Sequence, residues 1–152
     1  AFFGDLKGAL VAAIQAGGPV NALNVCNAQA PAITAAHSKP DLQLARTSLK
    51  LRNPANAPDA WEKSVLEKFE ARKAAGEDPM KMEYHEVVEM DGKQVFRYMK
   101  AIPTAAKPCL ACHGEKVAPG VEEKLKQLYP ADQARGYKAG DIRGAFTIKQ
   151  PM

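Results

Sequence analysis

Residues 84–102 read YHEVVEMDGKQVFRYMKAI. Two runs within this segment, 84–90 and 94–102, are rich in β-branched and aromatic residues and are typical of extended chain, and Asp91-Gly92 lies between them. Asp-Gly between two such runs is typical of the tight turn of a β-hairpin, because both turn residues adopt positive φ. We therefore expect two antiparallel strands here.

Helical patterns precede this hairpin. Apolar residues recur at helical spacing over residues 6–14, and Gly-Gly-Pro at 17–19 then breaks the pattern. A second helix is expected from this break, with Pro31 kinking or ending it. Residues 38–59 contain several prolines and basic side chains, and we expect an irregular basic connection there.

A clearer helix is expected after this connection. Asp59 and Glu62 have the spacing of a capping box at its start, and Gly76 marks its end. Its apolar residues share one face, which predicts that they point inward: Trp61, Val65, Leu66 and Phe69.

Further elements follow the hairpin. The pattern predicts a short helix near 121–128, a glycine-rich turn at 136–141 and a last strand at 142–148. This order of elements predicts an α+β fold with N-terminal helices and an antiparallel sheet, forming one domain over residues 1–152.

Composition excludes several classes of protein. The net charge of +4 is spread along the chain and aromatic residues are few, so we expect no nucleic-acid partner. The apolar stretches, such as 8–14, are shorter than the roughly 20 residues of a membrane-spanning helix, so a membrane span is not expected. The chain starts at Ala1 without a charged-then-apolar leader, which fits a mature exported protein.

The most specific motif is Cys109-Leu110-Ala111-Cys112-His113. Cys-x-x-Cys-His places two thiols to form thioethers with haem and the histidine to bind its iron, so it predicts one covalently attached haem c. A chance match in a chain with this composition is expected about once in a thousand. Half of a zinc site is an alternative, but the sequence has no second Cys pair, and a thioredoxin-like dithiol would require a βαβ context.

The second axial ligand is open at this stage, because Met, His and Cys all serve in that position. Cys26 is an unpaired cysteine with small neighbours on a predicted helix, and its alternative role is that of a small buried side chain. The other candidates, which we expect to be surface or packing residues, are His37, His85, Met80, Met82, Met90, Met99 and Met152.

Five segments resemble one family of exported c-type haem proteins with a PAS-like fold, long catalogued as a domain of unknown function. They are GPVNALNVC at 18–26, RTSLKLRNPAN at 46–56, PDAWE at 58–62, CLACHG at 109–114 and GYKAGD at 136–141. Members occur alone or ahead of histidine-kinase and chemoreceptor modules. The resemblance implies a PAS-like domain in which His113 is the first axial ligand and Cys26 the second.

A His/Cys pair has functional consequences. A thiolate donates electrons strongly, so we expect a low reduction potential, with Cys26 leaving after reduction and NO or CO taking its place. Arg46 and Arg52 are candidate propionate ligands, or else solvated charges and loop contacts. We expect His113 and Cys26 to hold the iron, and Cys109 and Cys112 the porphyrin.

These expectations favour a periplasmic redox or diatomic-gas sensor that signals through a separate protein. The alternative is a low-potential electron-transfer cytochrome c with a redox partner protein. An enzyme, such as a peroxidase, is the least expected class, since the sequence places no acid/base group at an open iron position.

Overall fold

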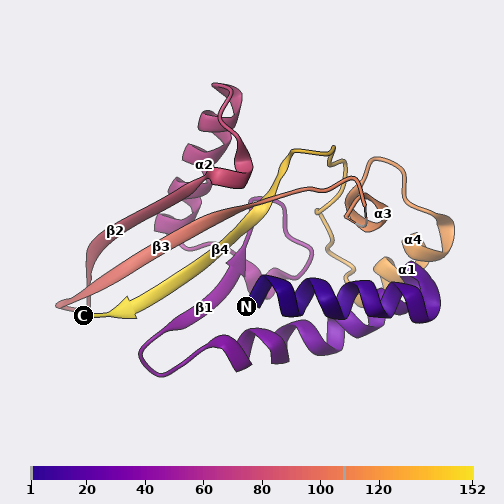
Figure 1. The fold of residues 1–152 in the computed structure, drawn as a ribbon, viewed down its shortest axis with the longest axis horizontal. Helices are drawn as coiled ribbons and strands as arrows, with labels where there is room; N and C mark the ends of the chain where they lie inside the picture. The colour runs from indigo at the N-terminus through magenta and orange to yellow at the C-terminus, as the bar shows by residue number, and fades with distance from the viewer. Residues whose placement is uncertain (1, 108) are drawn as a thin grey trace.

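The computed structural model describes residues 2–107 and 109–152, which form helices packed around one four-stranded sheet (Figure 1). The longer helices are α1 (Phe2–His37), α2 (Ala60–Ala74) and α4 (Pro119–Leu128), and α3 (Leu110–His113) is a single turn. Two short 3-10 helices are η1 (Pro54–Asn56) and η2 (Pro79–Lys81). The strands are β1 (Gln43–Thr47), β2 (Glu83–Met90), β3 (Lys93–Pro103) and β4 (Ile142–Pro151).

The sheet is antiparallel throughout, in the order β1-β4-β3-β2. Met90 pairs with Lys93, so Asp91 and Gly92 form a two-residue turn, and their φ angles are 53° and 76°. The predicted hairpin, the α+β class and the antiparallel sheet are therefore confirmed.

Helix α1 consists of two arms. Gly17 and Gly18 leave the helical conformation, and Gly18 has a φ of 74°. The arms then run antiparallel and side by side (Figure 1), and the imidazole of His37 lies 2.6 Å from the carboxylate of Asp5. The predicted break at 17–19 is confirmed, while the second arm continues past Pro31 to His37.

By length and composition, the helix over Gly4–His37 is apolar enough to cross a membrane, a property it shares with signal sequences and with core helices. The break at Gly17 and Gly18 divides this helix into two antiparallel arms. The expectation that the chain does not span a membrane therefore stays a prediction.

The connection at 38–59 is more regular than expected. It contains η1 and strand β1, which pairs with β4 so that Arg46 lies opposite Phe146. The prediction of a wholly irregular segment was wrong because β1 is short and mostly polar, and its partner lies far away in the sequence. Local patterns carry no information about such a pairing.

Helix α2 covers one face of the sheet. Its capping box is confirmed: Asp59 accepts a bond from the Glu62 amide at 2.8 Å, and Glu62 accepts one from the Asp59 amide at 3.0 Å. Gly76, with a φ of 96°, follows the end of the helix as predicted. The core between helix and sheet contains Val65, Leu66, Phe69, Met82, Met99, Ala101, Ile142 and Ala145, with Trp61 packed against it.

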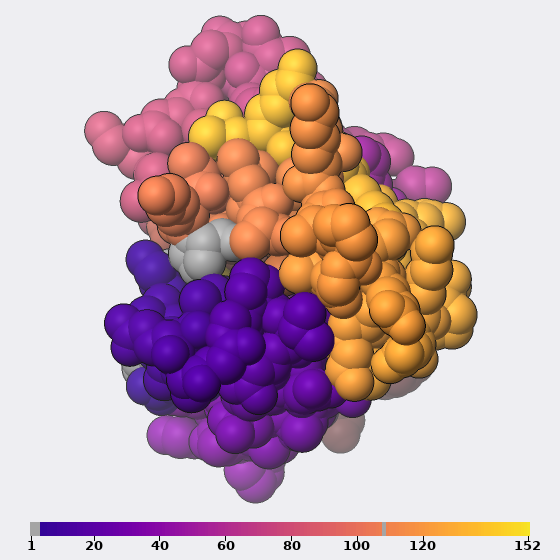
Figure 2. Space-filling model, turned by 90° about the vertical axis from the view of Figure 1, so that its right-hand side faces the viewer, coloured from indigo at the N-terminus to yellow at the C-terminus, as the bar shows by residue number. Residues whose placement is uncertain are grey.

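A second, smaller core joins α1 to α4. Leu23 in the second arm of α1 packs with Val121 and Leu125 in α4, and Cys112 packs against them. Figure 2 shows the indigo and violet α1 in contact with the orange region of α4 on one face of the molecule. This core fixes the second arm of α1 near the Cys-x-x-Cys-His motif.

Candidate functional site

A cavity of about 550 Å³ lies between α1, α3 and the end of the sheet. Cys26, Cys109, Cys112 and His113 all line it. Cys26 comes from the second arm of α1 and the other three from the motif, so two distant segments meet here. The volume lies within the range of cofactor pockets, and the remaining walls are largely apolar side chains of α1.

Helix α3 presents the motif to this cavity. The amides of Cys112 and His113 both donate to the Cys109 carbonyl, at 3.3 and 3.0 Å, which closes one turn. Gly114 then ends the turn, where a Cβ would lie 2.6 Å from the Leu110 carbonyl oxygen. One tight turn therefore places both thiols and the imidazole on the cavity.

The His113 ring is held in one orientation. Its Nδ1 lies 2.9 Å from the Ala134 carbonyl oxygen, so Nδ1 carries the proton that is donated to this oxygen. Burial, together with the charges of Arg143 and Arg52, lowers the pKa of His113 to about 3. The imidazole is therefore neutral at pH 7, with Nε2 free of a proton, which is the form that binds a metal.

Arg52 joins the elements around this histidine. Its guanidinium donates to the Cys112 carbonyl, to the Ala134 carbonyl at 3.1 Å and to the Asp132 carboxylate at 3.1 Å. The side chains of Arg52 and Asp132 are only 9% and 2% exposed. Burial alone would raise the pKa of Asp132, but bonds from Arg52 and the Ala134 amide outweigh it and lower that pKa.

Cys26 faces the basic side of the cavity. Burial raises the pKa of its thiol, while the charges of Arg46 and Arg52 oppose that rise. Arg46 comes from β1, and burial lowers its pKa while Cys26 opposes the shift. Burial is the larger effect, so the pKa of the Cys26 thiol stays above its ordinary value, and the nearby Arg46 cation limits the rise.

The other predicted ligand candidates lie elsewhere. His37 pairs with Asp5, His85 on β2 packs beside Phe96 on β3, and Met82 and Met99 belong to the core under α2. Among the described residues that line the cavity, Cys26 is the one second-ligand candidate. In residues 2–107 and 109–152, no three His, Cys, Asp or Glu side chains are grouped to hold a bare metal ion.

Comparison with known proteins identifies the family of this chain. A family model described as Tll0287-like, Tll0287, matches residues 8–151. The chain belongs to the Tll0287-like family. No curated protein matches the sequence.

A solved structure resembles this member of the Tll0287-like family over nearly its whole length. It is the crystal structure of the cyanobacterial haem protein Tll0287, with 27% sequence identity and a TM-score of 0.66. The match covers 99% of this chain and 91% of that chain. The relative is thus a haem protein with a similar fold.

Two residues of the site in this Tll0287-like chain were missed by sequence analysis. Arg143, in β4, lies with its Nε 3.5 Å from Nε2 of His113, and Asp132 anchors Arg52. Neither belongs to a motif, and both reach the site through pairing or loops distant in sequence. Arg46 and Arg52 line the cavity. Arg52 makes the loop contacts that were its alternative role, and contact of either arginine with propionates stays a prediction.

Proposed function

We propose that this chain is an exported, periplasmic c-type haem protein that acts as a redox or diatomic-gas sensor. One haem c would be attached through Cys109 and Cys112, with His113 and Cys26 as axial ligands. The observation that carries the proposal is the convergence of these four side chains on one cavity. The haem-protein relative and the Cys-x-x-Cys-His spacing support the same cofactor.

The sheet order β1-β4-β3-β2, with α2 on one face, is consistent with a PAS-like fold. When bound, the haem would supply a redox-active iron, which the His113 imidazole and the Cys26 thiolate would hold. The protein's part is to orient and polarise those ligands. The Ala134 carbonyl directs Nε2 of His113 toward the cavity, and the bond it accepts makes the imidazole a better donor.

Arg46 and Cys26 are the residues that could couple a change at the haem to a change in the protein. The Arg46 cation favours the thiolate form of Cys26, whereas burial favours the neutral thiol. Burial is the larger of the two effects, so an added positive charge at the cavity centre would shift Cys26 from the thiol toward the thiolate. A change at Cys26 would act on the second arm of α1, which packs on α4 through Leu23, and this arm is the proposed output to a separate signalling protein.

Spectroscopy of matched variants tests the ligand assignment. We would record absorption and EPR spectra of the ferric protein, matured in a host with haem-attachment machinery, beside Cys26→Ala and Thr34→Ala. Thr34 is the matched control, because it lines the same cavity from the same helix and has no sulfur or imidazole nitrogen that could bind the iron. Loss of a low-spin thiolate signal in Cys26→Ala alone supports the proposal, and an unchanged Cys26→Ala spectrum refutes it.

Measurements on the reduced protein distinguish a gas sensor from an electron-transfer protein. Spectral changes on adding CO or NO after reduction support the sensor. Reversible electrochemistry with the same two ligands in both states would instead assign a low-potential electron-transfer cytochrome c with a redox partner protein.

A further inference from the structure

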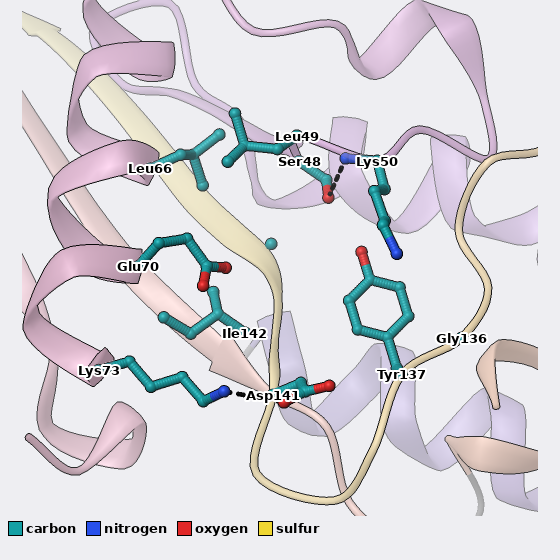
Figure 3. A pocket seen from close by; sticks show the side chains of 11 residues that line it. Ser48, Leu49, Lys50, Leu66, Glu70, Lys73, Gly136, Tyr137, Asp141 and Ile142 are labelled. Atoms are coloured by element: carbon teal, nitrogen blue, oxygen red, sulfur yellow. Dashed lines mark hydrogen bonds and ion pairs between the residues drawn. The ribbon is translucent and has the colours of Figure 1, made fainter. Parts of the chain in front are cut away.

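A second cavity, of about 320 Å³, lies between α2, the start of β4, and the loops around residues 48–50 and 136–141 (Figure 3). It shares no lining residue with the cavity that holds Cys26 and His113. Tyr137 separates the two, because its ring meets the His113 ring edge to face at a centroid distance of 6.3 Å. The second cavity is therefore a distinct site next to the proposed haem site.

One wall of this cavity is acidic. Glu70 extends from α2, and Figure 3 shows its carboxylate directed into the space. Within residues 2–107 and 109–152, the Glu70 carboxylate takes part in no hydrogen bond or ion pair of the structure. The nearby Lys73 ammonium is hydrogen-bonded to Asp141 at 2.8 Å, and this bond together with the charge of Glu70 raises the pKa of Lys73. Glu70 is exposed, and its carboxylate oxygens can accept hydrogen bonds from a ligand.

The opposite wall carries a hydroxyl and a positive charge. Tyr137 is 7% exposed, and its hydroxyl points into the cavity (Figure 3). The Lys50 ammonium lies 5.1 Å from the centre of the Tyr137 ring and donates to the Arg135 carbonyl at 3.1 Å. An ammonium has three donors, so Lys50 retains capacity to bind an anion.

Apolar side chains form the rest of the lining. Leu66 and Ile142 are buried at the base, whereas Leu49 is 41% exposed at the cavity. Lys73 and Asp141, which are partly exposed at the cavity, neutralise each other's charge in an ion pair. A ligand that matches this surface has an apolar body, a cation toward α2 and an anion toward the loops.

We propose that this cavity binds a small zwitterion with an apolar side chain, of the free amino acid class. Its ammonium would pair with Glu70, and its carboxylate would accept bonds from Lys50 and Tyr137. The volume lies at the lower end of small-molecule pockets, which fits a ligand of this size. This inference does not depend on the proposed haem chemistry, since no residue of the haem cavity takes part.

Calorimetric titration of the haem-loaded protein tests the proposal, with L-leucine as the probe. Two analogues each remove one charge: 4-methylpentanoate lacks the ammonium, and 3-methylbutylamine lacks the carboxylate. We expect leucine to bind and each analogue to bind at least about tenfold more weakly, because each leaves one charged group unpaired. No heat of binding for leucine at millimolar concentration, or equal binding of 4-methylpentanoate, would overturn the proposal.

Variants locate the site. Glu70→Gln and Tyr137→Phe should each weaken leucine binding by about tenfold. Glu67→Gln is the matched control, since Glu67 is exposed on the same helix outside the cavity. Equal affinity in Glu70→Gln and Glu67→Gln would overturn the assignment, provided that both variants melt at the wild-type temperature. If Glu70→Gln melts below wild type, Tyr137→Phe, which removes only the hydroxyl, replaces it in this comparison. Equal leucine affinity in Tyr137→Phe and Glu67→Gln would then overturn the assignment.

Discussion

Replacing Arg52 by Met should destabilise the protein strongly. The guanidinium bonds to Asp132, to the Cys112 carbonyl and to the Ala134 carbonyl, and both charged side chains of the pair are at most 9% exposed. Methionine fills similar space but cannot donate, so the Cys112 carbonyl loses this donor and Asp132 and the Ala134 carbonyl each lose one of theirs. The loop that holds the His113 acceptor would lose its buried side-chain connection to the segment after β1 and keep the bond from the Gln133 amide to the Leu51 carbonyl.

The size of the effect follows from the burial of the pair. Removing one partner of a buried ion pair costs about 3–5 kcal/mol. Arg135 still donates to Asp132 at 3.0 Å, as does the Ala134 amide at 2.9 Å, so the lower end applies. At about 2–4 °C per kcal/mol for a chain of this size, the melting temperature should fall by about 6–12 °C.

Thermal melts followed by far-UV circular dichroism measure this fall in the haem-loaded protein. Arg135→Met is the matched control, because Arg135 binds the same Asp132 but its side chain is 31% exposed. A partly exposed pair contributes about 1 kcal/mol or less, so the control should melt only a few degrees below wild type. A fall in Arg52→Met no larger than in Arg135→Met would refute the reasoning.

Two further predictions concern stability. Hydrogen bonds and ion pairs lower the pKa of Asp132 and Asp141 in the folded protein, so both carboxylates stabilise it above about pH 4 and that stability is lost as the pH falls through their folded pKa values. Urea midpoints should therefore drop from pH 6 to pH 3, with a smaller drop in Asp132→Asn; a flat wild-type profile would contradict this. Gly144→Ala should cost about 1–3 kcal/mol, because its Cβ would lie 2.4 Å from the Thr47 carbonyl oxygen. Gly120→Ala should melt no lower than wild type, because its Cβ would only make an ordinary van der Waals contact with Cγ2 of Val20 at 3.7 Å. Equal urea midpoints for the two alanine variants would count against the close approach of β1 and β4.

Local signals predicted much of the fold. Asp91-Gly92 forms the hairpin turn, and the capping box of Asp59 and Glu62 begins α2, because each depends on residues within one turn of chain. Strand β1 escaped prediction because its stability comes from pairing with β4, at Arg46 opposite Phe146. The sequence between them contains no local sign of that register.

The candidate site likewise has one part that local sequence predicts and another part that depends on tertiary packing. Cys109, Cys112 and His113 lie on one helical turn, so their spacing alone indicates their chemistry. Spacing left Cys26 undecided among many candidates, and the packing of Leu23 on α4 is what brings the second arm of α1 to the motif. Arg143 and Asp132 reach His113 and Arg52 from β4 and from the loop after α4, positions that no short pattern specifies.

The most direct test of the account is the intact mass of the chain after maturation in a host with haem-attachment machinery. Under denaturing conditions that extract free haem, the wild type should keep the mass of one haem and its Soret absorption, and Cys109→Ser/Cys112→Ser should lose both. A wild-type mass equal to that of the polypeptide alone, with no Soret band, would contradict covalent attachment at these cysteines.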